Sequence, residues 1–232
     1  MQRRLTGLAV GVAAALAIAG ALAGPAALWL HYLCKPLATM LVFFSVLQVG
    51  SPSSEVYRRA ILGGLTWSLA GDVALMLPAD VLASGFLIGL GSFLVAHLFF
   101  LRAFLRDARL FGKRWVPLVL VVACALNLVI LWPGLAPELR GPVIAYMLCL
   151  VAMSAQAVSR ALALGTRASR LAGAGGLLFV LSDTLLAYDR FHAPLPAAPL
   201  LILASYYAAL WLIASSVEAM PQACGADGAC AR

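Results

Sequence analysis

Two aspartates stand inside long apolar stretches of the sequence, where a carboxyl group is costly to place. Asp72 falls in an apolar run that begins near residue 60, and Asp183 falls in another over residues 171–188. A charged side chain at the centre of a membrane helix costs at least ~2.5 kcal/mol, so such a residue is expected to face a bundle interior and to have a function. Two carboxyl groups in one low-dielectric site can divide the roles of general acid and general base.

The two aspartates lie at the same depth when they are counted from the basic residues that precede them. Asp72 follows Arg59 by about 13 positions, and Asp183 follows Arg170 by the same number. At 1.5 Å per helical residue, both side chains lie roughly 20 Å from that end of their helices. Four further polar residues are predicted near this level: Lys35, Asn127, Tyr146 and Tyr206. Together the six form the polar layer that a binding site inside a helical bundle requires.

The same two carboxyl groups fit other roles as well. Paired carboxylates inside a membrane also form the relays of proton-coupled transporters. A single buried Asp can instead serve as a hydrogen-bonded link between two helices. The residues alone favour neither the enzyme nor the transporter, whereas a purely structural role does not account for two acids at one depth.

A histidine lies in one of the apolar stretches, but no metal-binding pattern accompanies it. His97 stands about five residues before Arg102, nearer the basic helix ends than the aspartates are. It is predicted either to make a structural hydrogen bond or to position a substrate. No spacing such as His-Glu-x-x-His occurs, and neither a Gly-x-Ser-x-Gly motif nor a phosphate-binding glycine loop is found. We therefore expect no metal, no cofactor, no serine hydrolase and no nucleotide enzyme.

The elements that must position these residues are membrane helices. Of the 232 residues, 64% are hydrophobic and 11% are charged, with a mean hydropathy of +1.01, far from the range of soluble domains. Crossing about 30 Å of hydrocarbon takes roughly 20 apolar residues. Such windows recur at residues 5–24, 28–49, 60–78, 81–101, 115–132, 141–159, 171–188 and 197–217. The sequence predicts an all-α polytopic transmembrane bundle of about eight helices, with residues 1–217 as one helical domain and 218–232 as a short cytoplasmic tail.

Basic residues alternate between the two sides of this bundle. One set of alternate connections holds most of them: Arg3, Arg4, Arg58, Arg59, Arg102, Arg106, Arg109, Lys113, Arg114, Arg160, Arg167 and Arg170. The opposite connections hold only Lys35, Arg140 and Arg190. The positive-inside rule then places both termini in the cytoplasm, in the inner membrane if the cell is bacterial. The net charge of +7 is explained by topology, so no nucleic-acid partner is expected. Residues 1–23 also resemble a cleavable signal peptide, and that alternative stays open.

Short motifs in a fixed order carry a family resemblance. They are Lys35-Pro36-Leu37, Gly71-Asp72 with Leu75, Ala96-His97-Leu98, Phe179 followed by Ser182-Asp183 and Phe191, and Tyr206-Tyr207. In order and placement, over about residues 30–215, the chain resembles the lysoplasmalogenase family of multi-pass membrane hydrolases. The resemblance implies hydrolysis of the vinyl ether bond of a lysoplasmalogen, which releases a fatty aldehyde and glycerophosphocholine or glycerophosphoethanolamine.

This chemistry fits the two aspartates. A vinyl ether is cleaved when its distal vinyl carbon is protonated, because the oxocarbenium ion so formed is captured by water and the hemiacetal then collapses. One protonated carboxyl group and one carboxylate meet that demand, so Asp72 and Asp183 are the predicted catalytic residues, with the acid unassigned. The predicted substrate contacts are Lys35, His97, Asn127, Tyr146 and Tyr206. Lys35 either binds the phosphate of the lysophospholipid or neutralises one Asp. Membrane lipid is the expected surrounding partner.

Overall fold

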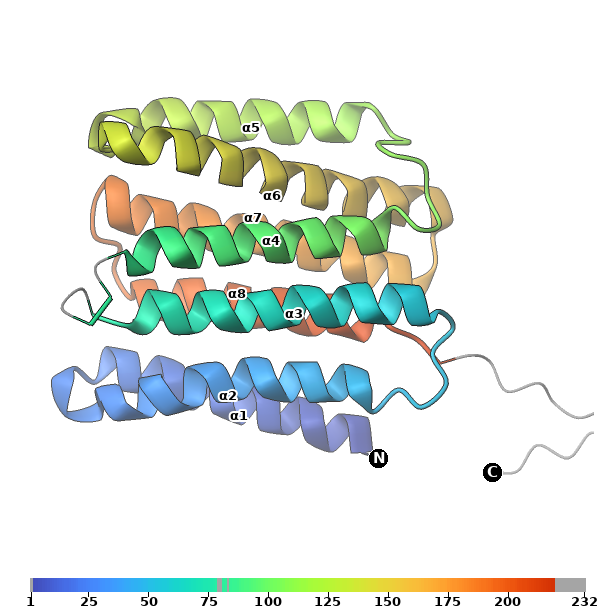
Figure 1. The fold of residues 1–232 in the computed structure, drawn as a ribbon, viewed down its shortest axis with the longest axis horizontal. Helices are drawn as coiled ribbons and strands as arrows, with labels where there is room; N and C mark the ends of the chain where they lie inside the picture. Colours follow the sequence, from blue (N-terminus) through green and yellow to red (C-terminus); the bar gives the residue numbers. More distant parts are fainter. Residues whose placement is uncertain (1, 79–80, 83, 220–232) are drawn as a thin grey trace, which may run out of the picture.

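The fold is a bundle of long helices that run side by side (Figure 1). The structure, a computed structural model, describes residues 2–78, 81–82 and 84–219. Within these ranges it has eight α-helices and no β-sheet, apart from one isolated β-bridge between Pro52 and Ala219. They are α1 (Gln2–Leu22), α2 (Leu28–Leu47), α3 (Glu55–Met76), α4 (Gly85–Phe104), α5 (Trp115–Leu131), α6 (Pro137–Leu164), α7 (Arg167–Phe191) and α8 (Ala198–Ser215). Short 3-10 turns, η1 (Pro25–Ala27) and η2 (Trp132–Gly134), precede α2 and follow α5.

Seven of the helices, all except α3, are long and apolar enough to cross a membrane. The eighth, α3, has 22 residues and packs between α2 and α4, so it runs through the bundle like its neighbours (Figure 1). Its lower hydropathy comes from a charged first turn and from Asp72. The chain is an integral multi-pass membrane protein, and the predicted polytopic helical bundle is confirmed. Of the predicted tail, residues 220–232 lie outside the described residues.

Several helices extend past the apolar windows from which they were predicted. α3 begins at Glu55 because the Ser54 hydroxyl caps it, accepting a hydrogen bond from the Tyr57 backbone N–H at 3.2 Å. α6 covers 28 residues, and it ends where Gly165 takes the left-handed conformation with φ 62°. Polar helix ends thus lengthen the helices beyond the segments that hydropathy detects.

The contact between α3 and α4 depends on two glycines of α3. A Cβ on Gly64 would lie 2.2 Å from the Phe100 ring, and one on Gly71 would lie 2.6 Å from the Phe93 ring. Neither position has room for a larger residue, so the two helices approach closely along this seam. Because Gly71 precedes Asp72, the same contact fixes the rotation of α3 that sets the direction of the Asp72 side chain.

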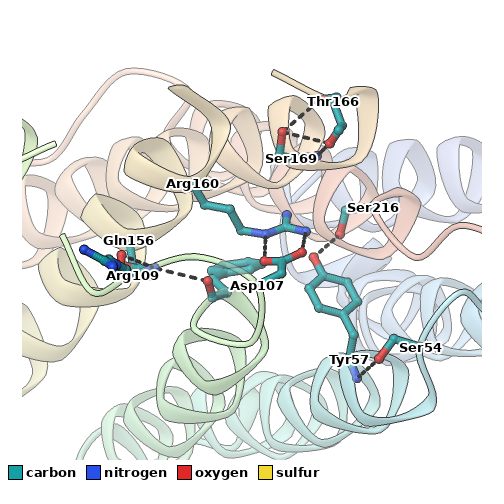
Figure 2. A network of polar contacts seen from close by, with 10 residues as sticks. Ser54, Tyr57, Asp107, Arg109, Gln156, Arg160, Thr166, Ser169 and Ser216 are labelled. Atoms are coloured by element: carbon teal, nitrogen blue, oxygen red, sulfur yellow. Dashed lines mark hydrogen bonds and ion pairs between the residues drawn. The ribbon is translucent and has the colours of Figure 1, made fainter. Parts of the chain in front are cut away.

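A polar network closes the bundle at the end where the 105–114 connection lies (Figure 2). Arg160 of α6 donates two hydrogen bonds to Asp107, Nε to Oδ1 at 2.6 Å and Nη2 to Oδ2 at 2.7 Å. The guanidinium also lies over the Tyr57 ring, whose hydroxyl is hydrogen-bonded at 2.7 Å to Ser216, the residue that follows α8. The Gln156 amide donates to the backbone carbonyl of Phe104 at 3.1 Å. These contacts attach the connection to α3, α6 and α8.

We expect Asp107→Asn to lower the thermal stability of the protein. Burial acts to raise the pKa of Asp107, but the hydrogen bonds and charge of Arg160 outweigh it and lower that pKa. The Arg160 side chain is only 6% exposed, so removing its partner leaves a buried charge unpaired. Because Asp107 is 35% exposed, the expected cost is about 2 kcal/mol, below the ~3–5 kcal/mol of a fully buried pair.

The measurement is thermal unfolding of the detergent-solubilised variant beside Glu55→Gln. Glu55 is 48% exposed and pairs with Arg58 at 2.9 Å, so its loss should change little. A carboxylate with a lowered pKa in the folded protein contributes to the stability of the fold above its unfolded pKa of about 3.9. This stability is lost as the pH falls from there through the folded pKa. The wild type and Asp107→Asn should therefore converge in acid. Equal melting temperatures of the two variants at neutral pH would contradict the prediction.

Candidate active site

Asp72 lies at the centre of a hydrogen-bonded cluster drawn from three helices. Its Oδ2 accepts from the Thr39 hydroxyl of α2 at 2.7 Å and from the Tyr206 hydroxyl of α8 at 2.8 Å. The ammonium nitrogen of Lys35, one helical turn before Thr39, lies 3.6 Å from Oδ1. The Asp72 side chain is 2% exposed. Two donors and one cation around a buried carboxyl group are the surroundings of an ionised carboxylate.

The backbone at Lys35 is also held by a hydrogen bond from α8. The Tyr207 hydroxyl donates to the carbonyl oxygen of Lys35 at 2.9 Å. Consecutive tyrosines of α8 therefore bind the acid and the helix segment that supplies its cation. The Lys35–Asp72 ion pair is consistent with one of the two roles that the sequence left open for this lysine, the neutralisation of an Asp.

Asp183 of α7 has different surroundings. The Tyr146 hydroxyl of α6 donates to its Oδ2. Within the described residues, no hydrogen bond reaches Oδ1 and no cation lies within ion-pair distance. A carboxyl group in an apolar bundle without a cation gains less from ionisation than one beside an ammonium. The two acids therefore differ in electrostatic environment: Asp72 has a cation beside it, whereas Asp183 has only a hydroxyl donor among the described residues.

The two acids open onto one cavity of about 140 Å³ among α2 to α8. Six of the seven predicted site residues line it: Lys35, Asp72, Asn127, Tyr146, Asp183 and Tyr206. Most other lining residues are apolar, among them Leu75, Leu90, Phe93, Leu128, Met147 and Leu150. A few polar groups in a largely apolar cavity are typical of sites for small or amphiphilic ligands.

Asn127 contributes to the cavity wall from α5. Its Nδ2 donates to the Ala123 carbonyl one turn back, at 2.8 Å. This leaves the amide oxygen and the second amide N–H of Asn127 free to bind a ligand. Asn127 makes no hydrogen bond to either Asp within the described residues.

His97 is the predicted site residue that the structure does not bring to the cavity. It is fully buried in α4, where its ring packs against Phe179 at 4.7 Å and Tyr146 at 5.2 Å between centroids. Neither ring nitrogen has a hydrogen-bond partner among the described residues. The position of His97 therefore supports neither a direct substrate contact nor a structural hydrogen bond. Its ring instead packs against Tyr146, the residue that donates a hydrogen bond to Asp183.

Comparison with known proteins identifies the family. The chain matches the YhhN family over residues 30–217, which is most of its length. The chain belongs to the YhhN family. The matched range includes every residue that lines the cavity, from Lys35 to Tyr206.

Several relatives of this YhhN family member carry an enzyme name. Lysoplasmalogenase TMEM86B of Sus scrofa is 36% identical over 191 residues, which cover 82% of this chain and 75% of that protein. Lysoplasmalogenase TMEM86B of Homo sapiens is 37% identical over 188 residues, 81% of this chain and 74% of that protein. An Escherichia coli O157:H7 protein named uncharacterized membrane protein YhhN is 31% identical over 140 residues, 60% of this chain and 63% of that one. No solved structure matches. The resemblance to the lysoplasmalogenase family is confirmed.

Two residues of this YhhN site were not singled out from the sequence. Thr39 bonds Asp72, and it follows Lys35 by one helical turn, which places both on the same face of α2. Arg190 lines the cavity, and it follows Asp183 by about two turns of α7. In both cases the helical spacing from a predicted site residue was the available signal.

Proposed function

We propose that this chain hydrolyses the vinyl ether bond of a lysoplasmalogen within the membrane, releasing a fatty aldehyde and glycerophosphocholine or glycerophosphoethanolamine. The observation that carries the proposal is that two carboxyl groups in opposite electrostatic surroundings line one largely apolar cavity. The names of the TMEM86B relatives support the same reaction. Catalysis by paired acid and base groups needs this kind of asymmetry.

Asp183 takes the part of the general acid. Its carboxyl proton passes to the distal vinyl carbon, and the electron pair of the C=C bond forms the new C–H bond. The positive charge is then shared between the other vinyl carbon and the ether oxygen. No cation lies within ion-pair distance of Asp183 in the described residues, so no fixed positive charge favours the ionised form over the protonated one. Tyr146 orients the carboxyl group by donating to Oδ2, which leaves Oδ1 for the transferred proton.

Asp72 takes the part of the carboxylate. Its negative charge stabilises the oxocarbenium ion and accepts a proton from the water that attacks it, so a hemiacetal forms. The C–O bond to glycerol then breaks, the glycerol oxygen takes up a proton and the hemiacetal hydroxyl loses one, which gives the aldehyde. Thr39, Tyr206 and Lys35 hold Asp72 for this role. The apolar side chains that line the cavity suit contact with the hydrocarbon part of such a substrate.

Incubation of the purified full-length protein in detergent with 1-alkenyl-glycerophosphocholine tests the proposal. We expect fatty aldehyde from this substrate and none from the saturated 1-alkyl ether, which has no C=C bond to protonate. In D2O the trapped aldehyde should carry one deuterium at the carbon next to the carbonyl, because that carbon receives the acid's proton. Aldehyde without this deuterium would exclude the protonation mechanism. Absence of aldehyde would exclude the activity and favour the proton-coupled transporter.

A further inference from the structure

The cavity extends from the two acids to the end of the bundle remote from the N-terminus. Phe86 in the first turn of α4, Arg190 and Phe191 in the last turn of α7, and Leu135 after η2 all line it. Figure 1 places these helix ends together, away from the end where α1 begins. The cavity therefore has an inner part, which holds the acids, and an outer part at the bundle end.

Arg190 supplies the cation of the outer part. Its guanidinium carbon lies 4.1 Å from the centroid of the Phe86 ring, and Phe86 packs edge-on against Phe191 at 5.8 Å. No carboxylate lies within ion-pair distance of Arg190 among residues 2–78, 81–82 and 84–219. The adjacent Asp189 points elsewhere, since its Oδ1 accepts from the Leu195 backbone N–H at 2.9 Å. Stacking on Phe86 thus holds a planar, five-donor cation at the cavity wall.

The other cation of the cavity is already engaged. Lys35 lies 3.6 Å from Asp72 in the inner part, where both side chains are buried. A phosphate drawn to Lys35 would compete with this ion pair and add a second anion beside two carboxyl groups. Arg190 has no such competitor in the described part of the chain. Of the two roles that the sequence left open for Lys35, the ion pair favours neutralisation of Asp72, and Arg190 is the better placed cation for a phosphate.

We propose that Arg190 is the binding site for the phosphate of a single-chain glycerophospholipid, an inference that rests on the proposed function of the same cavity. Asp183 and Arg190 are seven residues apart on α7, which is roughly 10 Å along the helix axis. In the substrate, about five bonds of ~1.5 Å link the vinyl ether oxygen to phosphorus, a span of roughly 6 Å. The Arg190 side chain covers the remaining distance, so one lipid reaches Asp183 with its vinyl ether and Arg190 with its phosphate.

This geometry makes Arg190 a specificity-determining residue. A guanidinium binds a phosphate through two parallel N–H···O bonds, whereas a neutral glycerol head offers no anion to it. The protein should consequently prefer an alkenyl-glycerophospholipid over the alkenylglycerol that lacks the phosphate. Either head group beyond the phosphate, choline or ethanolamine, is compatible with this contact.

The test compares kcat/KM for 1-alkenyl-glycerophosphocholine and 1-alkenylglycerol in the full-length wild type and in Arg190→Gln. We expect the preference for the phosphate-bearing substrate to fall about tenfold or more, mainly through KM. Arg190→Lys, which keeps the charge and loses the bidentate contact, should fall between the two. Arg140→Gln is the matched control, since Arg140 stacks on Trp132 at 4.6 Å in the same manner but does not line the cavity. An unchanged preference in Arg190→Gln, or an equal change in Arg140→Gln, would overturn the proposal.

A binding measurement separates this inference from the activity. The probes are 1-O-hexadecyl-glycerophosphocholine, which has no vinyl ether, the phosphate-free 1-O-hexadecylglycerol, and inorganic phosphate. The phosphate-bearing lipid should raise the melting temperature of the wild type more than the other two, and this excess should be lost in Arg190→Gln. That outcome supports the phosphate site even if no aldehyde is ever released. Equal protection of both proteins by this lipid, or equal protection of the wild type by inorganic phosphate alone, would overturn it.

Discussion

Asp183→Asn should fold and should lose at least ~100-fold of its vinyl ether hydrolysis. A general acid contributes about 100- to 10,000-fold in rate, and an amide cannot donate a proton to carbon in its place. Asn keeps the size of the side chain, and its carbonyl oxygen can still accept from the Tyr146 hydroxyl. The loss should therefore appear in kcat, while the melting temperature and the size-exclusion profile stay close to those of the wild type.

Asp189→Asn is the matched control for this variant. Asp189 lies on the same helix but binds the Leu195 backbone N–H and does not line the cavity. The pH profile gives a second check: wild-type kcat should fall as the pH rises through the range in which Asp183 loses its proton, because only the protonated form is an acid. Turnover by Asp183→Asn within tenfold of the control would assign this residue to packing and would leave the acid to be found elsewhere.

The depth of the site was predictable because each helical residue advances by a fixed rise and basic residues mark one end of the membrane helices. Counting 1.5 Å per residue from the basic helix ends placed six residues from six helices near one height, and all six line the same cavity. The relation between Asp72 and Asp183 is the clearest case, since their helices are far apart in the sequence. Axial position in such a bundle thus follows from the sequence.

Rotation about the helix axis was not predictable in the same way. α4 is apolar on nearly all faces, so nothing in the sequence indicates which face holds His97, and its ring proved to lie behind Tyr146. Thr39 carries a small polar group that membrane helices tolerate anywhere, and only its contact with Asp72 marks it. Arg190 lies beyond the apolar window of its helix, where the positive-inside rule treats an arginine as a topology signal.

The Lys35–Asp72 pair should control stability as well as chemistry. Removing one member of a buried ion pair costs about 3–5 kcal/mol, because the other charge is left without a partner in a low-dielectric environment. Lys35→Met keeps the length of the side chain and removes the charge, so it should lower the melting temperature of the protein markedly. Asp72→Asn should do the same to a smaller extent, since the amide oxygen can still accept from the Thr39 and Tyr206 hydroxyls.

The double variant Lys35→Met with Asp72→Asn separates the two roles of the pair. With both charges gone, most of the lost stability should return, since replacing a whole buried ion pair is often close to neutral. Hydrolysis should remain at least ~100-fold below the wild type, because no carboxylate is left to stabilise the oxocarbenium ion or to activate water. Thermal unfolding and aldehyde release, measured on the same preparations of the three variants, give both quantities. Recovery of activity together with stability would mean that Asp72 acts only in packing, and the reaction would then require a carboxylate other than this one.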